Sequence, residues 1–349
     1  MPARFEKAAS RADQVASFDQ YGRPPIERLH HFLHANPTAA PLIVPALSLV
    51  EFGSIADNFL TAFNFSLIVQ QVTVIGVLGI AQTLVILTAG VDLSVAAIMV
   101  PSSVVMGRLG VTMGLPIGFA LLLGLAVGMA AGAINGALIT RLRLPPFIAT
   151  LGARSIFLAL TQWYSEAQTV RSQDIDAAAP LLKIWGERAP LMGAQFTTGS
   201  FLMIAMFSVG WYLLNKAPRG RAVHAIGDDK DAAELAGIRT DKVLHSVYIG
   251  AGAVCAIAGW IAIGRLGSVS PQSFYNGNLD AITAVVIGGC SLFGGRGSIM
   301  RALVGALIVG VFRSGLKLAE VNVLWQQFTV RLLIIIAEAV DQWIRKVSA

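Results

Sequence analysis

Residues 225–239 read AIGDDKDAAELAGIR, a short polar island in an otherwise very apolar chain. Asp228 is suited to cap a helix, because its carboxylate can accept hydrogen bonds from the exposed N–H groups of the first turn, and Asp231 follows three positions later. Gly237 fits the end of that helix, because helices commonly end on a residue with positive φ, which glycine adopts without steric cost. The segment therefore predicts a short helix outside the apolar runs.

The predicted helix has one small apolar face. Ala232, Leu235 and Ala236 recur at helical spacing, while Glu234 and the other charged side chains fall elsewhere. Such a face suits docking against another protein. A solvated loop helix without a partner is the alternative interpretation.

The composition of the whole chain is that of a membrane protein. Of its 349 residues, 55% are hydrophobic and 13% are charged, whereas a soluble domain carries about 25% charged residues. Several apolar runs reach the length of about 20 residues that a transmembrane helix needs. We expect an all-α polytopic protein of about ten transmembrane helices, with a cytoplasmic tail at 1–38 and a transmembrane domain at 39–349.

Basic residues indicate the orientation of the chain. They concentrate in the tail, in short loops and at the C-terminus, which is the positive-inside pattern, so the net charge of +6 is not a sign of nucleic-acid binding. This pattern predicts that residues 215–243, with the short helix, lie in the cytoplasm together with both termini.

Glycines mark two features of the membrane region. Gly124, Gly128, Gly132 and Gly136 recur every four residues, so they stack on one helix face and allow a neighbouring helix to approach closely. Glycines also interrupt the apolar runs once in each half, around 90–94 and 288–298, and in transporters such paired interruptions mark a path between two repeats. Ordinary kinks between spans are the alternative.

Residue patterns for catalysis or metal binding are weak. His30, His31 and His34 have helical spacing, but no acidic or cysteine ligand is clustered with them, so we expect solvated side chains and no metal. Cys255 and Cys290 sit in apolar runs and predict neither a disulfide nor a metal site. The sequence has no HExxH, GxSxG or GxxxxGK[ST] pattern, so we expect neither an intramembrane enzyme nor a P-loop ATP site in this chain.

Three passages together resemble the permease subunits of ATP-binding-cassette importers for monosaccharides, of the ribose, xylose and galactose type. They are IAQTLVILTAGVDLSV at 80–95, like the family's TLVILTGGIDLSVG; AIGDDKDAAELAG at 225–237, like AIGGNxxAAxLAGI; and SLFGGRGS at 291–298. The similarity runs from about residue 41 to the C-terminus. Within this family the whole chain looks most like the fructose permeases. Ribose and mannose are other sugars that such systems take.

The resemblance implies a subunit that moves a monosaccharide across the bacterial inner membrane and works as a homodimer or with a similar permease. A separate cytoplasmic ATPase would bind ATP and dock on the short helix predicted within residues 225–239. A periplasmic sugar-binding protein would deliver the sugar. This chain would hold no cofactor. Its partners would also include membrane lipid. The family's coupling motif EAAxxxG corresponds to residues 231–237 with Asp in place of Glu, and the implied ATPase-coupling residues are Gly227, Asp228, Asp231, Ala232, Ala233, Glu234 and Gly237.

Polar residues within the apolar runs are candidates for the sugar path. Those best placed to line or brace it are Gln82, Asp92, Ser94, Asn135 and Asp280. Each could instead cap or join helices. A secondary transporter working alone is the rival interpretation, and it would need ion-coupling charges near the membrane midplane, for which Asp92 and Glu338 are the candidates.

The chain departs from the family pattern in two ways. Ala96 stands where the family usually has Gly, and charges lie in or near the last two spans at Arg301, Arg313, Arg331 and Glu338. One buried charge costs about 2.5–3.5 kcal/mol on insertion scales. Arg331 and Glu338 are spaced so that they could pair, and Arg313 could snorkel towards an interface. An altered substrate path or a weakened transporter are the alternatives.

Overall fold

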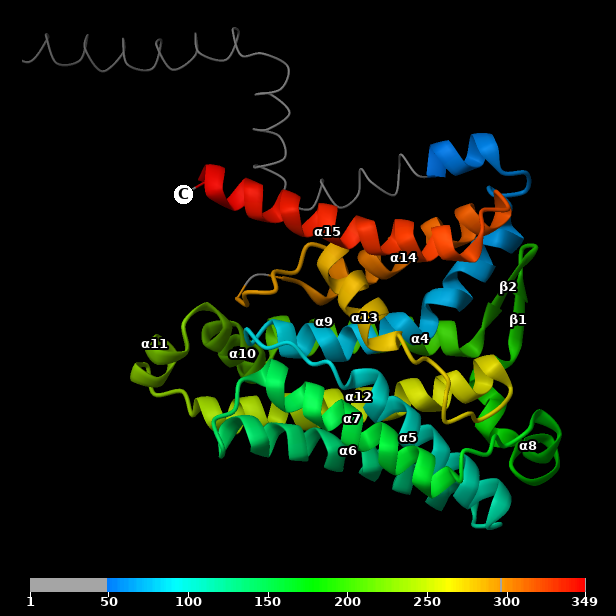
Figure 1. The fold of residues 1–349 in the computed structure, drawn as a ribbon, viewed down its shortest axis with the longest axis horizontal. Coiled ribbons are helices and arrows are strands. Elements are labelled where there is room, and N and C mark those ends of the chain that lie inside the picture. Colours follow the sequence, from blue (N-terminus) through cyan, green and yellow to red (C-terminus); the bar gives the residue numbers. More distant parts are fainter. Residues whose placement is uncertain (1–48, 296, 349) are drawn as a thin grey trace, which may run out of the picture.

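A computed structural model of the protein describes residues 49–348, apart from residue 296. The predicted tail at 1–38 and its histidines lie outside the described residues. The described chain is a bundle of α-helices with one small β-hairpin (Figure 1). Six of its described helices are long and apolar enough to cross a membrane. The all-α polytopic class is confirmed, while the larger count of about ten crossings stays a prediction.

The six spans alternate with shorter or more polar elements. They are α4 (Ala62–Ile86), α5 (Val95–Gly107) with the π-helical turn η1 (Arg108–Thr112), α6 (Ile117–Thr140), α9 (Thr198–Lys216), α12 (Thr240–Leu266) and α14 (Ile299–Leu318). Three further helices belong to the bundle: α7 (Pro146–Ser165), the short apolar α13 (Gly277–Ile287) and the C-terminal α15 (Val323–Ser348).

The remaining elements lie at the two ends of the bundle (Figure 1). At one end are α10 (Pro218–Asp228) and α11 (Lys230–Leu235). At the other are α8 (Ser172–Ala178), the 3₁₀ turn η2 (Pro180–Gly186) and the antiparallel strands β1 (Arg188–Leu191) and β2 (Ala194–Thr197). The hairpin, which we did not predict, turns at Met192 and Gly193, both with positive φ, as its tight two-residue connection requires.

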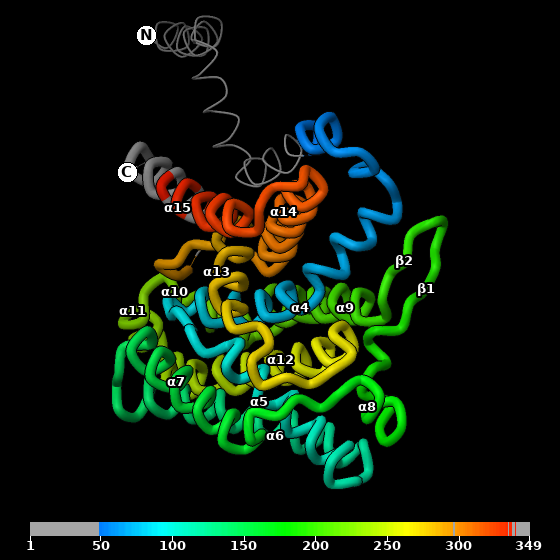
Figure 2. The backbone as a smooth tube through the Cα atoms, turned by 45° about the vertical axis from the view of Figure 1, so that its right-hand side comes forward, coloured from blue at the N-terminus to red at the C-terminus, as the bar shows by residue number. Residues whose placement is uncertain are grey.

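The helix α4 forms the centre of the bundle. It contacts α9, α12, α13 and α14 (Figure 2), and 83% of its most apolar 18-residue stretch is buried. Its sequence contains no Asp, Glu, Lys or Arg, so protein can surround it without burying a charge. By contrast, only 28% of the most apolar 18-residue stretch of α6 is buried. The outward face of α6 is therefore an apolar surface for lipid.

The glycine stripe of α6 packs closely against neighbouring helices, as predicted: Gly124 meets α5, and the other three glycines meet α12. A Cβ atom placed on Gly128 would lie 2.5 Å from the carbonyl oxygen of Gly252, and one on Gly132 would lie 2.2 Å from the carbonyl oxygen of Tyr248. No real Cβ tolerates these distances, so the two helix backbones come this close only because the side chains are absent.

Substitution of Gly132 tests this packing. We expect Gly132→Ala to lower the free energy of unfolding by about 1–3 kcal/mol, because the new methyl group must push the backbones apart. The control is Gly118→Ala, in the same helix, where a Cβ atom would meet nothing within 4 Å. Thermal unfolding in detergent measures both variants, and equal melting temperatures would contradict the packing argument.

Candidate coupling and translocation site

The polar island folds into the last turns of α10 and the short helix α11, but its cap is not Asp228. The carboxylate of Asp229 accepts hydrogen bonds from the N–H groups of Asp231 at 2.9 Å and Ala232 at 3.0 Å. Asp228 still belongs to α10, whereas Asp229 has the extended backbone that a capping residue needs. The predicted cap was wrong by one residue because α10 runs further than the sequence indicated. Gly237, with φ of +85°, ends α11 as predicted.

The predicted coupling residues divide into an exposed and a buried set. Exposed are Asp228, Asp231, Ala232, Glu234 and Gly237. Leu235, beside them, is 91% exposed, so the small apolar face of α11 has no cover within the described chain. Gly227 and Ala233 are buried, and Ala233 packs with Ile226 and Leu244. One side of α11 therefore holds the loop onto the bundle while the other is free for a partner.

Gly227 lies directly against the two glycine-interrupted segments. A Cβ atom on Gly227 would fall 1.8 Å from the carbonyl oxygen of Leu87 and 2.6 Å from the backbone nitrogen of Gly295. The N–H group of Gly295 in turn donates to the carbonyl oxygen of Leu87 at 3.4 Å. The interruptions near 90–94 and 288–298, separate in the sequence, thus meet at the end of α10.

Asp92, Ser94 and Asn135 form one buried cluster. The Asp92 carboxylate accepts from the Ser94 N–H at 2.7 Å and from its hydroxyl at 2.6 Å, and the Asn135 amide donates to the Ser94 hydroxyl at 2.8 Å. All three side chains are at most 1% exposed. The cluster ties the break before α5 to α6, which is a bracing role within the fold.

Gln82 and Asp280 lie apart from that cluster. Gln82 is fully buried in α4, and neither polar atom of its side chain has a hydrogen-bond partner among the described residues. Leaving such a group unpaired costs about 1–3 kcal/mol. Among the predicted path residues, Gln82 leaves both of its side-chain polar atoms without a hydrogen bond inside the described bundle, and Asn135 leaves its Oδ1 without one.

Asp280 joins three helices through two arginines. Its carboxylate Oδ1 lies 2.7 Å from the guanidinium of Arg313 and 3.1 Å from that of Arg331. Arg331 thus pairs with Asp280. The spacing also allowed a pairing with Glu338, whose side chain lies outside the described residues, so that part stays a prediction. Arg313 likewise turns inward to Asp280 and does not snorkel. Arg301, a residue of α14, is half-buried, and its backbone carbonyl packs against Gly288.

The family of the chain follows from comparison with known proteins. Residues 64–337 match the model of a family described as the permease component of the branched-chain amino acid transport system, so the chain belongs to this family of membrane permeases. The class predicted from the sequence, the permease subunit of an importer of the ATP-binding-cassette type, is confirmed at the level of class.

Three curated relatives are sugar permeases. The chain is similar to the fructose import permease FrcC of Rhizobium meliloti, with 51% identity covering 99% of this chain and 96% of the relative. It is 36% identical to the ribose import permease RbsC of Bacillus subtilis, covering 91% and 96%. It is 33% identical to the D-allose permease AlsC of Escherichia coli, covering 86% and 90%. No solved structure matches the chain significantly.

The Asp280 cluster yields a stability prediction. Asp280→Asn leaves two partly buried guanidinium groups without a counter-charge, and we expect a loss of about 3–5 kcal/mol in unfolding free energy. The matched control is Asp176→Asn, which removes an ion pair to Lys183 from a side chain that is 60% exposed, where a loss below about 1 kcal/mol is expected. Comparable melting temperatures for the two variants would rule out a bracing role for Asp280.

Proposed function

We propose that this permease moves a monosaccharide, fructose in the first instance, across the bacterial inner membrane, driven by a separate cytoplasmic ATP-binding subunit that docks on α11. The observation that carries the proposal is the exposed face around Leu235 on a loop whose other side holds Gly227 against both interrupted membrane segments. The similarity to a fructose import permease over 99% of the chain supports the choice of sugar.

The contact at Gly227 explains how a movement outside the membrane reaches the path. ATP binding closes the ATPase pair and displaces α11 and α10. Because Gly227 touches Leu87 and Gly295 backbone to backbone, no flexible side chain absorbs that displacement. The segments that precede α5 and α14 shift with it, the bundle opens to the outside, and hydrolysis resets it.

The proposal also includes the assembly around this chain. A second permease copy, most simply the same chain, completes the conduit, and a periplasmic sugar-binding protein delivers the sugar at the end of the bundle that carries α8. Both termini and α11 lie in the cytoplasm. ATP is bound and hydrolysed by the partner subunit, and this chain carries no cofactor.

A secondary transporter is the weaker alternative. It needs a carboxylate free to exchange a coupling ion. Of the two candidates, Asp92 is engaged by Ser94, and the side chain of Glu338 lies outside the described residues. Uptake by vesicles that stops with a protonophore while ATP is still present would favour this alternative over the ATPase-driven mechanism.

Substitution of Leu235 tests the docking face. Leu235→Glu places a charge in the proposed apolar contact, and we expect the affinity for the ATPase subunit to fall by about tenfold or more. Met192→Glu is the matched control, because Met192 is 96% exposed at the opposite end of the bundle. Co-purification of the ATPase subunit with each variant measures the effect. Full retention of the ATPase by Leu235→Glu would remove α11 from the docking site.

Substitution of Gly227 separates docking from coupling. In Gly227→Ala the methyl group collides with the Leu87 carbonyl, so we expect the ATPase subunit still to bind while uptake per ATP hydrolysed falls by about tenfold. Gly152→Ala in α7 is the control, since a Cβ atom there meets nothing within 4 Å. Unchanged uptake in the Gly227 variant would show that the force is transmitted elsewhere.

A further inference from the structure

An open cavity lies between α5, α7 and the loop that leads from α12 to α13. We propose that it is a sugar-binding subsite on the outer half of the translocation path, and that the methyl group of Ala96 limits the size of sugar it accepts. This inference rests on the proposed function and adds to it a place where the sugar pauses after leaving the binding protein.

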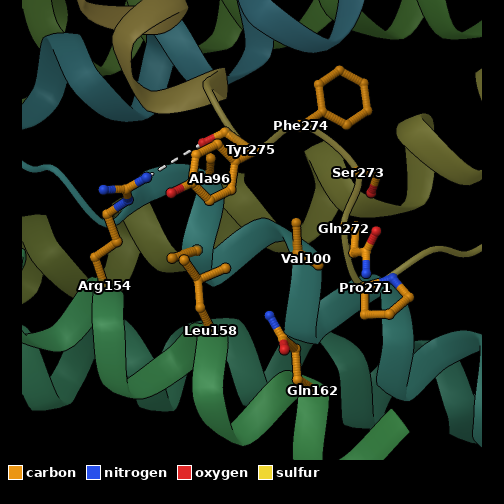
Figure 3. A pocket seen from close by; sticks show the side chains of 11 residues that line it. Ala96, Val100, Arg154, Leu158, Gln162, Pro271, Gln272, Ser273, Phe274 and Tyr275 are labelled. Carbon is orange, nitrogen blue, oxygen red and sulfur yellow. Dashed lines mark hydrogen bonds between the residues drawn. The ribbon is translucent and has the colours of Figure 1, made fainter. Parts of the chain in front are cut away.

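The cavity is large enough for a monosaccharide. Its volume is about 340 Å³, at the lower end of the range for small-molecule pockets, about 300–1,000 Å³. Figure 3 shows the side chains of Arg154 and Gln162 rising from α7 towards the loop at 271–275, with Ala96 and Val100 of α5 between them. The remaining lining residues are Ala97, Leu158, Pro271, Gln272, Ser273, Phe274 and Tyr275.

The polar groups of the lining suit a neutral polyol. The Arg154 guanidinium lies 5.3 Å from the ring centre of Tyr275 and reaches the Tyr275 carbonyl oxygen only at 3.5 Å, so most of its donors are uncommitted within the described chain. The side-chain amides of Gln162 and Gln272 add donors and acceptors, which sugar hydroxyls can pair with in both directions. An aromatic face such as that of Tyr275 packs against the C–H groups of a sugar ring.

The lining also excludes other ligands. It contains one cationic group and no carboxylate, so a metal or organic cation has no counter-charge there. The walls of the cavity are mostly apolar and carry a few polar groups that point inward, which is typical of a small-molecule site. A neutral sugar therefore fits the lining better than a cation does.

The position of the cavity connects it with the coupling contact. Its floor is the first turns of α5, which follow the Asp92–Ser94 break, and its lid is the loop that enters α13. Gly277 at the start of α13 approaches Ala96 so closely that a Cβ atom there would lie 3.2 Å from the Ala96 methyl group. Movement of the interrupted segments would therefore change the space between floor and lid.

Ala96 is the departure from the family pattern that this cavity explains. Where the family usually has glycine, the extra methyl group stands in the cavity wall between α5 and α13. One methyl group in a tight pocket discriminates between ligands by roughly tenfold or more. Ala96 is thus placed to select among sugars by size without contacting the binding protein.

A second cavity supplies the control. It has a volume of about 490 Å³ and lies near the same outer end, between η1, the end of α7 and α8, where Arg108, Gln168 and Asp174 line it. Neither the start of α5 nor the loop before α13 contributes to its lining. A substitution of Gln168 therefore changes an outer cavity without touching the proposed subsite.

Protection of an introduced thiol from labelling tests whether sugar occupies the cavity. The native Cys255 and Cys290 are buried, so a maleimide added to the complex with its ATPase subunit should label mainly Gln162→Cys or Gln168→Cys. We expect fructose to slow labelling of Gln162→Cys by about tenfold at saturation and to leave Gln168→Cys unchanged. Labelling of Gln162→Cys at the same rate with and without fructose would overturn the proposal.

The size limit is tested in the same assay. In a Gln162→Cys background, Ala96→Gly should raise the protection given by methyl β-fructofuranoside, relative to fructose, by about tenfold. An unchanged ratio between the two sugars would remove Ala96 as the size-limiting group.

Uptake by proteoliposomes that hold the permease, the ATPase subunit and the binding protein distinguishes failure of the subsite from failure of the transport function. Arg154→Gln should lower fructose uptake per ATP by about tenfold. Gly152→Ala in the same helix, where a Cβ atom meets nothing within 4 Å, should match the unaltered permease. If the unaltered complex takes up fructose and Arg154→Gln does so equally well, the subsite is wrong and the transport function stands. If the unaltered complex takes up no sugar, the transport function and the subsite both fail.

Discussion

The contact on which the arrangement depends is the one between Gly227 and the backbone of Leu87 and Gly295. It is made where no side chain fits, so the end of α10 can sit against the ends of two membrane segments at once. Backbone packed on backbone is stiff, because neither partner has a rotamer to change. The loop that carries Gly227 and the two interruptions therefore form one stiff unit.

The helices α6 and α12 also pack backbone against backbone, at positions where glycine leaves no side chain between them. Between α6 and α12, Gly128 faces Gly252, and each would collide with the backbone of the other helix if it carried a Cβ atom. Lipid provides no hydrophobic drive for helices to associate, so close van der Waals contact between small residues has to supply it. Charges are paired between helices: Asp280 binds both Arg313 and Arg331 and so joins α13, α14 and α15 through one carboxylate.

Predictions from local sequence were accurate where only glycine could meet the structural requirement. The four-residue glycine period predicted the face of α6 that meets α12, and Gly237 ended α11 with positive φ as expected. Prediction failed where two adjacent residues were chemically equivalent. Asp228 and Asp229 can both cap a helix, and only the length of α10, set by its packing against the bundle, decided which of them does so.

The sequence by itself determined the membrane class, the place of the short polar helix and the polar residues inside the apolar runs, because hydropathy, charge bias and glycine spacing are properties of neighbouring residues. The tertiary structure decided which of those polar residues meet. Asp92, Ser94 and Asn135 close into a buried brace, Asp280 takes the two arginines, and Ala96 comes to line an outer cavity with Arg154. Such pairings join helices that are far apart in the chain, and their partners depend on how the helices pack against one another, which local spacing does not encode.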